Sequence, residues 1–171
     1  HTLDTAYDPV AECSIANHAG FGMNLANSWS LKWAKDNDYA DAEVSVELTL
    51  RQIEKLRKCI PVGVIRYGHF PLMISRNAPN GANETCKNND FLQDRKGEKF
   101  PIMRHEEYFE ILNCVPILMP QKDYPQGEGV FDIIRFTVEN SVENKEKILQ
   151  KLRKNSGFER FTHGLYLRGV K

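Results

Sequence analysis

Residues 42–67, AEVSVELTLRQIEKLRKCIPVGVIRY, decide the fold class of this 171-residue chain. Apolar and polar residues alternate over Ala42–Leu48, which predicts a strand. Thr49 and Gln52 form the sequence of a capping box, and apolar residues at helical spacing follow, so a helix should begin here. The β-rich run Pro61–Tyr67 then predicts a second strand. A strand–helix–strand unit of this length favours parallel pairing and an α/β fold.

The preceding residues show the same alternation of strand and helix. We expect a strand over Phe21–Leu25 and a helix over Ser28–Lys35, with Ser28 as its N-cap. Trp29 and Trp33 lie four residues apart and therefore share one face of that helix. Large aromatic side chains at this spacing more often pack into a core than bind a ligand, so we expect both to be buried.

The alternation is interrupted by an insert at about 76–110. Leu72–Ser75 is β-rich, but the polar residues after it have no periodicity and predict a loop. Phe91–Gln93 and Lys99–Met103 flank a turn in which Gly97 occupies the place that needs a positive φ. This insert is therefore expected to consist of a loop followed by a β-hairpin.

The last third of the chain returns to strands and a helix. Val115–Met119 and Val130–Thr137 are apolar runs that predict buried strands. A helix should begin in the Asn-Ser-Val-Glu sequence at Asn140 and end near Lys154, shortly before a glycine. No linker or repeat divides the sequence, so residues 1–171 are expected to form one domain.

Composition and the start of the chain set the expected cellular context. Hydrophobic residues make up 41% of the chain, and no apolar run is long enough to cross a bilayer. The first residues are too polar for a signal peptide, and the chain begins with His1 instead of Met. We therefore expect a cytoplasmic protein without a membrane partner, and a chain that is a piece of a longer one.

Motifs of several metal and protease sites are missing from the sequence. Its four cysteines form no Cys-x-x-Cys pair, and reduced, buried thiols are expected. HEEYF at 105–109 begins like a zinc-protease motif, but Phe109 stands at the place of the second histidine. No Gly-x-Ser-x-Gly nucleophile elbow occurs either.

Charge is unevenly distributed although the formal net charge is zero. Residues 145–171 contain eight basic and two acidic residues, which leaves the rest of the chain with an equal excess of acid. A basic segment of this kind can bind phosphate groups or an acidic partner, but it is more often a solvated helix face followed by a tail. If it binds a partner, we expect weak, salt-sensitive binding of RNA.

Five stretches, in this order, resemble the collagenase-like peptidase family known as U thirty-two. They are FGMNLANSWS (21–30), VSVELTLRQIEKL (44–56), YGHFPLMISRNAP (67–79), FLQDRKGEKFPI (91–102) and FTHGLYLRGV (161–170). The resemblance implies a TIM-barrel-like (β/α) domain of which this chain is the C-terminal half, because a whole barrel needs about 250 residues. Half a barrel leaves open sheet edges, so the missing N-terminal half or a homo-oligomer is the implied partner.

Family members also resemble proteins that support hydroxylation of RNA bases or quinone precursors with an iron–sulfur cluster. Four cysteines hold the cluster in those members. Carried over to this sequence, the ligand positions fall at Ala78, at Cys86, near Phe91, and near Glu107 or Tyr108. Cys86 would therefore be a remnant ligand, and no cofactor is expected here although cysteine-complete relatives hold an iron–sulfur cluster.

The resemblance leaves two functions open. The first is a peptidase, a hydrolase for which Glu47, His69 and Cys86 are the catalytic candidates. Glu47 lies near the C-terminal end of the expected strand Ala42–Leu48, where barrel active sites lie, although a helix-dipole contact explains it equally well. Cys86 would need a histidine brought close by the fold, and His69 stands where the family has arginine. The alternative is a non-catalytic scaffold that binds RNA or another partner.

Four residues are candidates for substrate binding: Arg76, Asp94, Arg95 and Arg168. Asp94 and Arg95 lie at the tip of the expected hairpin, where charged residues often do no more than solvate a turn. Both explanations stay open for the hairpin tip on sequence grounds.

Overall fold

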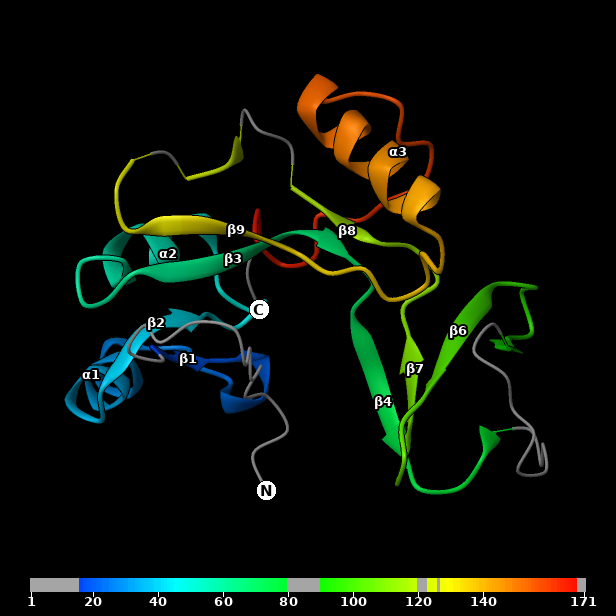
Figure 1. Cartoon of the computed structure of the whole chain (residues 1–171), viewed down its shortest axis with the longest axis horizontal. Coiled ribbons are helices and arrows are strands. Elements are labelled where there is room, and N and C mark those ends of the chain that lie inside the picture. The colour runs from blue at the N-terminus through cyan, green and yellow to red at the C-terminus, as the bar shows by residue number, and fades with distance from the viewer. Residues whose placement is uncertain (1–15, 80–89, 120–122, 126, 169–171) are drawn as a thin grey trace. The chain divides into compact units, whose positions relative to one another are not determined.

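A computed structural model of the chain describes residues 16–79, 90–119, 123–125 and 127–168 (Figure 1). The fold is mixed α/β, with one parallel and one antiparallel sheet. The chain forms two compact units. The first contains the residues up to Arg66, Met119–Ile133 and the residues from His163, and the second contains Tyr67–Leu118 and Ile134–Thr162.

The first unit is a parallel sheet with two helices in its crossovers. In chain order its elements are β1 (Asn17–Ala19), η1 (Phe21–Met23), α1 (Ser28–Asp36), β2 (Tyr39–Glu43), α2 (Leu50–Leu56), β3 (Val62–Gly68) and β9 (Val130–Ile134). Strand β2 pairs in parallel with β1 and with β3. Strand β9 lies on the other side of β3, where Val62 N donates to Gly129 O at 2.9 Å. Strands β1, β2 and β3 are therefore adjacent in the order in which the chain makes them, and β9 joins β3 only after β4 to β8.

Local sequence explains where both helices of this unit begin. The Asn27 side chain accepts a hydrogen bond from Ser30 N at 2.9 Å, so Asn27 is the N-cap of α1. Thr49 caps α2 in a capping box with Gln52. Both helices bury apolar side chains in the core of the unit, including Leu31 on α1 and Ile53 on α2.

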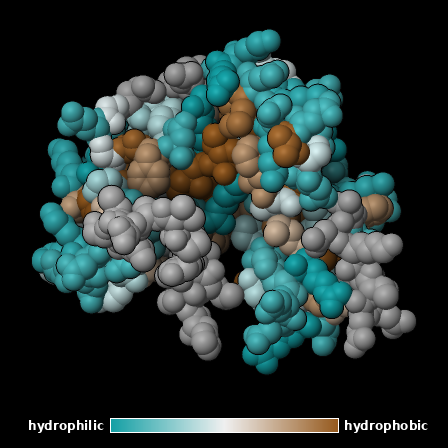
Figure 2. All heavy atoms as spheres, in the orientation of Figure 1, coloured by the Kyte–Doolittle hydropathy of each residue, from teal (hydrophilic) through white to brown (hydrophobic). Residues whose placement is uncertain are grey.

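One face of the parallel sheet carries two aromatic rings that lie close together. The rings of His18 on β1 and Phe131 on β9 have centroids 6.1 Å apart. Gly63 on β3, which has no side chain, leaves room on this face for Phe131 and Ile133. Hydrophobic atoms gather over β3 and β9 in Figure 2, which uses the same view as Figure 1.

The second unit is built on an antiparallel sheet and one long helix. Its elements are β4 (Pro71–Ser75), β5 (Phe91–Gln93), β6 (Lys99–Arg104), β7 (Phe109–Leu112), β8 (Ile117–Leu118) and α3 (Val142–Lys154). The sheet has the order β4-β7-β6-β5, and β8 pairs with the end of β3 through Tyr67 and Leu118. These two residues and Leu152 of α3 form a buried apolar cluster. The cluster fixes α3 next to the end of β3.

Most expected elements are present, with shifts of a few residues. The cap at Thr49, the strand that ends near Tyr67, and the hairpin around Gly97, whose φ is +83°, are confirmed. The strand expected over Phe21–Leu25 is wrong, because a 3-10 turn forms there and β1 lies before it.

The expected burial of the two tryptophans is also wrong. Trp29 is 81% exposed and Trp33 is 51% exposed, because α1 turns Leu31 and Ala34 toward the core instead. No helix of the described residues is long and apolar enough to span a membrane.

Candidate functional site

A groove in the second unit gathers basic side chains beside helix α3. Its volume is about 400 Å³. Three lysines line it, Lys147, Lys151 and Lys154, together with Glu139. Val138 and Ile148 supply apolar surface in the same groove. The groove therefore combines positive charge with a volume within the range of small-molecule binding sites, about 300–1,000 Å³.

The helix presents its lysines on one side because of their spacing. Lys147, Lys151 and Lys154 follow one another at intervals of four and three residues, which places them on one helical face. The Ser141 side chain caps the helix by accepting a hydrogen bond from Asn144 N at 3.1 Å. Basic residues in the last turn interact favourably with the helix dipole, so the sequence stabilises the helix that carries the groove.

Glu139 is a buried carboxylate that is held by two donors. The Tyr67 hydroxyl donates to Glu139 Oε1 at 2.6 Å, and Thr137 N donates to Oε2 at 3.1 Å. Glu139 is 9% exposed. Burial, and then the hydrogen bond to Glu139, raises the pKa of Tyr67 far above its usual range. The phenol therefore stays protonated and keeps donating to the carboxylate.

The lysines differ in how strongly they are already engaged. Lys147 pairs with the exposed Glu143 at 2.6 Å, one turn earlier on α3, an interaction of little strength in water. The Lys151 ammonium lies 5.6 Å from the centroid of the Phe158 ring. Three lysines against the carboxylates of Glu139 and Glu143 leave the groove with one net positive charge, which favours an anionic ligand.

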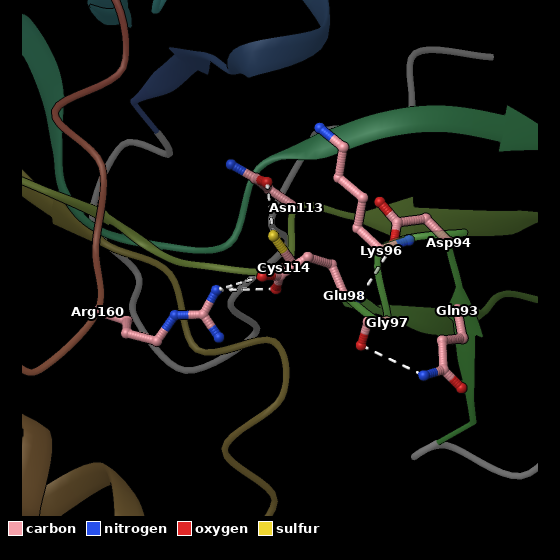
Figure 3. Close-up of polar contacts among 8 residues, drawn as sticks. All are labelled: Gln93, Asp94, Lys96, Gly97, Glu98, Asn113, Cys114 and Arg160. Atoms are coloured by element: carbon pink, nitrogen blue, oxygen red, sulfur yellow. Dashed lines mark hydrogen bonds and ion pairs between the residues drawn. The ribbon is translucent and has the colours of Figure 1, made fainter.

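A second polar cluster joins the β5–β6 hairpin to the segment after α3 (Figure 3). Arg160 Nη2 donates to both carboxylate oxygens of Glu98, at 2.9 and 2.8 Å. The hydrogen bond to Glu98 is the main cause of the raised pKa of Arg160. Nearby, the Cys114 thiol donates to Asn113 Oδ1 at 3.7 Å. Both partners of the ion pair are exposed, so it orients the hairpin more than it stabilises the unit.

The hairpin tip shows why Asp94 occupies its position. Asp94 Oδ1 accepts hydrogen bonds from Lys96 N at 2.8 Å and from Glu98 N at 2.9 Å. Gln93 Nε2 donates to Gly97 O on the same turn at 3.3 Å (Figure 3). The Asp94 carboxylate is thus engaged in forming the turn, while Arg95 is exposed beside it.

The other predicted residues of the second unit lie around strand β4. His69, between β3 and β4, is 8% exposed, and its Nδ1 is 2.7 Å from Asn113 O. Because a carbonyl oxygen can only accept, Nδ1 is the donor in this contact. Arg76 is exposed directly after β4.

Two predicted residues belong to the first unit. Glu47 is exposed in the segment between β2 and α2, and its N–H donates to Ser45 Oγ at 3.4 Å. Arg168 is exposed near the end of the described chain, where its N–H donates to Leu165 O at 3.2 Å. Asp94 and Arg95 are neighbours in the hairpin tip, and no hydrogen bond or ion pair joins any two of the predicted site residues that the structure describes.

The positions carried over for an iron–sulfur cluster do not fit that group. Ala78 and Phe91 have no ligand atom, and Glu107 and Tyr108 offer oxygen where such clusters need thiolate sulfur. Cys86, the remaining position, lies outside the described residues. Within the ranges that the structure describes, no group of three or more His, Cys, Asp or Glu side chains could hold a metal ion.

Sequence analysis did not identify the residues that shape the groove. The basic segment was visible in the sequence, but Glu139 and Tyr67 are 72 residues apart and no motif links them. The signal that could have pointed to the groove is the lysine spacing on the last helix.

No protein-family model, curated protein or solved structure matches this chain.

Proposed function

We propose that this chain is a binding scaffold for RNA, formed by the later part of a (β/α) barrel that resembles the collagenase-like peptidases. The observation that carries this proposal is the groove that Lys147, Lys151 and Lys154 line together with Glu139, whose carboxylate is already held by two donors. Lysine ammonium groups bind phosphates as point charges, and a row of them can follow a phosphate backbone.

Two features of the first unit support a partial barrel. Strands β1, β2 and β3 pair in parallel in chain order, and helices α1 and α2 connect them. The antiparallel strands β4 to β7 are inserted between β3 and β9, and they contain most of the stretches 67–79 and 91–102 that carry the resemblance. In a complete barrel the outer strands of such a sheet pair with the remaining strands, so the missing half is the proposed partner in a longer protein.

RNA is favoured over an acidic protein as the ligand because of the resemblance. Some members of the family resemble proteins that act on RNA bases with the help of an iron–sulfur cluster. In this chain Ala78 and Phe91 stand at two of the positions where those proteins have cysteine ligands. A relative without that cluster can retain affinity for the polymer while it lacks the chemistry. The groove then serves to hold RNA and not to transform it.

The proposal is tested by comparing two variants of equal charge. Lys147→Gln, Lys151→Gln and Lys154→Gln together remove the three cations of the groove. Arg51→Gln, Lys55→Gln and Arg153→Gln together remove three exposed cations elsewhere, two on α2 and one on α3.

The readout is the fluorescence anisotropy of a labelled single-stranded RNA at low salt. The groove variant should bind about tenfold more weakly than the native chain, or worse, and the matched variant should bind nearly as well as the native chain. Equal loss in both variants would show that only the total charge matters. Absence of binding by the native chain would end the proposal.

A second candidate is the peptidase activity that the resemblance implies. The observation that favours it is the exposed side chain of Glu47, four residues beyond the carboxyl end of β2, on the side where barrel enzymes place acid–base groups. The test is release of peptides from gelatin by the native chain and by Glu47→Gln. Activity that survives this substitution, or no activity in the native chain, would count against the peptidase.

A further inference from the structure

A second groove, in the first unit, combines an exposed tryptophan with lysines. It has a volume of about 470 Å³. Trp29, Lys32 and Lys35 of α1 line it together with Lys58, which follows α2. No residue of this groove lies in the second unit, so it is distinct from the groove beside α3.

The exposure of Trp29 is unusual for its residue type. Its side chain is 81% exposed, whereas tryptophan is highly buried on average. The helix that carries it is well anchored, because Asn27 caps it and Leu31 and Ala34 are completely buried. The indole is therefore presented to solvent from a fixed backbone, as a flat apolar surface on a rigid support.

The charges around the indole favour an anion. Lys32 pairs with Asp36 at 2.6 Å in an exposed ion pair, which is worth little in water and can rearrange. Lys35 and Lys58 add two more positive charges, so lysines outnumber carboxylates three to one in the lining. An aromatic surface interleaved with cations is the combination that binds single-stranded nucleic acid.

We propose that the Trp29 indole stacks on an unpaired base of single-stranded RNA whose phosphates contact Lys32, Lys35 and Lys58. This proposal rests on the proposed function in one respect, which is that RNA is the polyanion that binds. A partner with an apolar surface would leave the three ammonium groups without counter-charge, and an acidic peptide would leave the indole without a flat π-partner. A single strand satisfies both parts of the groove, whereas a duplex keeps its bases stacked within the helix.

The intrinsic fluorescence of the chain tests the stacking directly. The chain has two tryptophans, so Trp33→Phe leaves Trp29 as the sole tryptophan, whose emission can be excited selectively over that of the tyrosines. Titration of this variant with oligouridylate should quench the emission, and duplex RNA of equal charge should quench it far less. Polyglutamate serves as the probe for an acidic peptide.

Substitution of Trp29 gives the energetic test. In the full chain, Trp29→Leu should weaken binding of oligouridylate about fivefold or more, which corresponds to the loss of one stacked base. Trp33→Leu changes a less exposed position of the same helix that does not line the groove. Because no base stacks on Trp33 in this proposal, the affinity should stay within about twofold of the native value. Both variants should retain the native circular dichroism spectrum, because neither side chain is part of the core.

The outcomes separate this proposal from the one on helix α3. RNA binding by anisotropy without quenching of Trp29 would overturn the stacking and leave the α3 groove supported. Equal quenching by duplex RNA or by polyglutamate would also overturn it. Quenching that persists when the α3 lysines are removed would support the Trp29 groove on its own, and no binding of any RNA would overturn both proposals.

Discussion

The hydroxyl of Tyr67, near the end of β3, donates a 2.6 Å hydrogen bond to the buried carboxylate of Glu139, which lies just before α3. The two residues are 72 positions apart in the sequence. Tyr67 also packs in the apolar cluster with Leu152 of α3. One side chain thus joins the strand to both the segment and the helix that border the basic groove, so the shape of the groove depends on it.

Tyr67→Phe should destabilise the second unit. The substitution keeps the ring in the cluster but removes the donor from a carboxylate that is 9% exposed. An unsatisfied buried acceptor costs about 1–3 kcal/mol, so the free energy of unfolding measured with urea should fall by that amount. Tyr39→Phe, at a partly exposed position, is the control and should change the stability by less than about 0.5 kcal/mol. Equal effects of both substitutions would contradict the role given to Tyr67.

Stability should fall at alkaline pH because of two buried phenols. The pKa of Tyr67 is raised by burial and by Glu139, and the pKa of Tyr124 is raised by burial and then by the carboxylate of Asp132. A group with a raised pKa in the folded state stabilises the fold below its unfolded pKa, about 10 for tyrosine, and this stabilisation is lost as the pH rises above it. The urea concentration at the unfolding midpoint should therefore fall as the pH is raised from about 8 to about 11, a range that spans the unfolded pKa of tyrosine.

A double variant, Tyr67→Phe with Tyr124→Phe, provides the control for the alkaline effect. Because it lacks both titrating groups, its stability should depend less on pH in that range than the stability of the native chain. An unchanged alkaline slope in the double variant would contradict the explanation.

Gly63→Ala should destabilise the parallel sheet by crowding. A methyl group at this position would lie 2.5 Å from Ile133 Cδ1 and 2.7 Å from Phe131 Cε2. Overpacking of this kind costs about 1–3 kcal/mol, measurable by thermal or urea unfolding. In the background of Ile133→Ala, which removes one of the two obstacles, the cost of Gly63→Ala should be smaller. Strict additivity of the two substitutions would show that the glycine is needed for another reason.

Strand β4 should mediate self-association of the isolated chain. It lies at one end of the antiparallel sheet among the described strands, and Leu72, Met73 and Ile74 are each more than half exposed. Such an apolar edge pairs readily with an edge of a second copy. Sedimentation velocity should show a dimer that dissociates in the variant Met73→Lys with Ile74→Lys. Leu167→Lys, at an exposed apolar site of the other unit, should leave the dimer intact, and a native monomer at high concentration would rule the dimer out.

The sequence predicts the elements whose signals are local. The Thr49–Gln52 box starts α2, and the positive φ of Gly97 closes the hairpin between β5 and β6, as expected. Strand β7 went unpredicted because Phe109–Leu112 is too short to show alternation, and it forms by pairing with β4 and β6. Tertiary pairing decides such a strand more than its own residues do.

The candidate sites were less accessible to sequence reasoning. Helical spacing shows that Trp29 and Trp33 share a face, but it does not show which face of α1 meets the sheet. Leu31 and Ala34 occupy the core-facing positions, so the tryptophans point to solvent. Likewise, the lysines of α3 are evident in the sequence. The groove also depends on the hydrogen bond between Tyr67 and Glu139, which are 72 residues apart in the sequence and share no motif.

The salt dependence of RNA binding tests the central proposal most directly. Each phosphate neutralised by a cation on a single strand contributes about 0.7 to the slope of log K against log salt concentration. Removing Lys147, Lys151 and Lys154 together should therefore reduce the slope by about 2, while the matched variant at Arg51, Lys55 and Arg153 should keep the native slope. A slope that is the same in all three proteins would contradict binding of RNA in the groove beside α3.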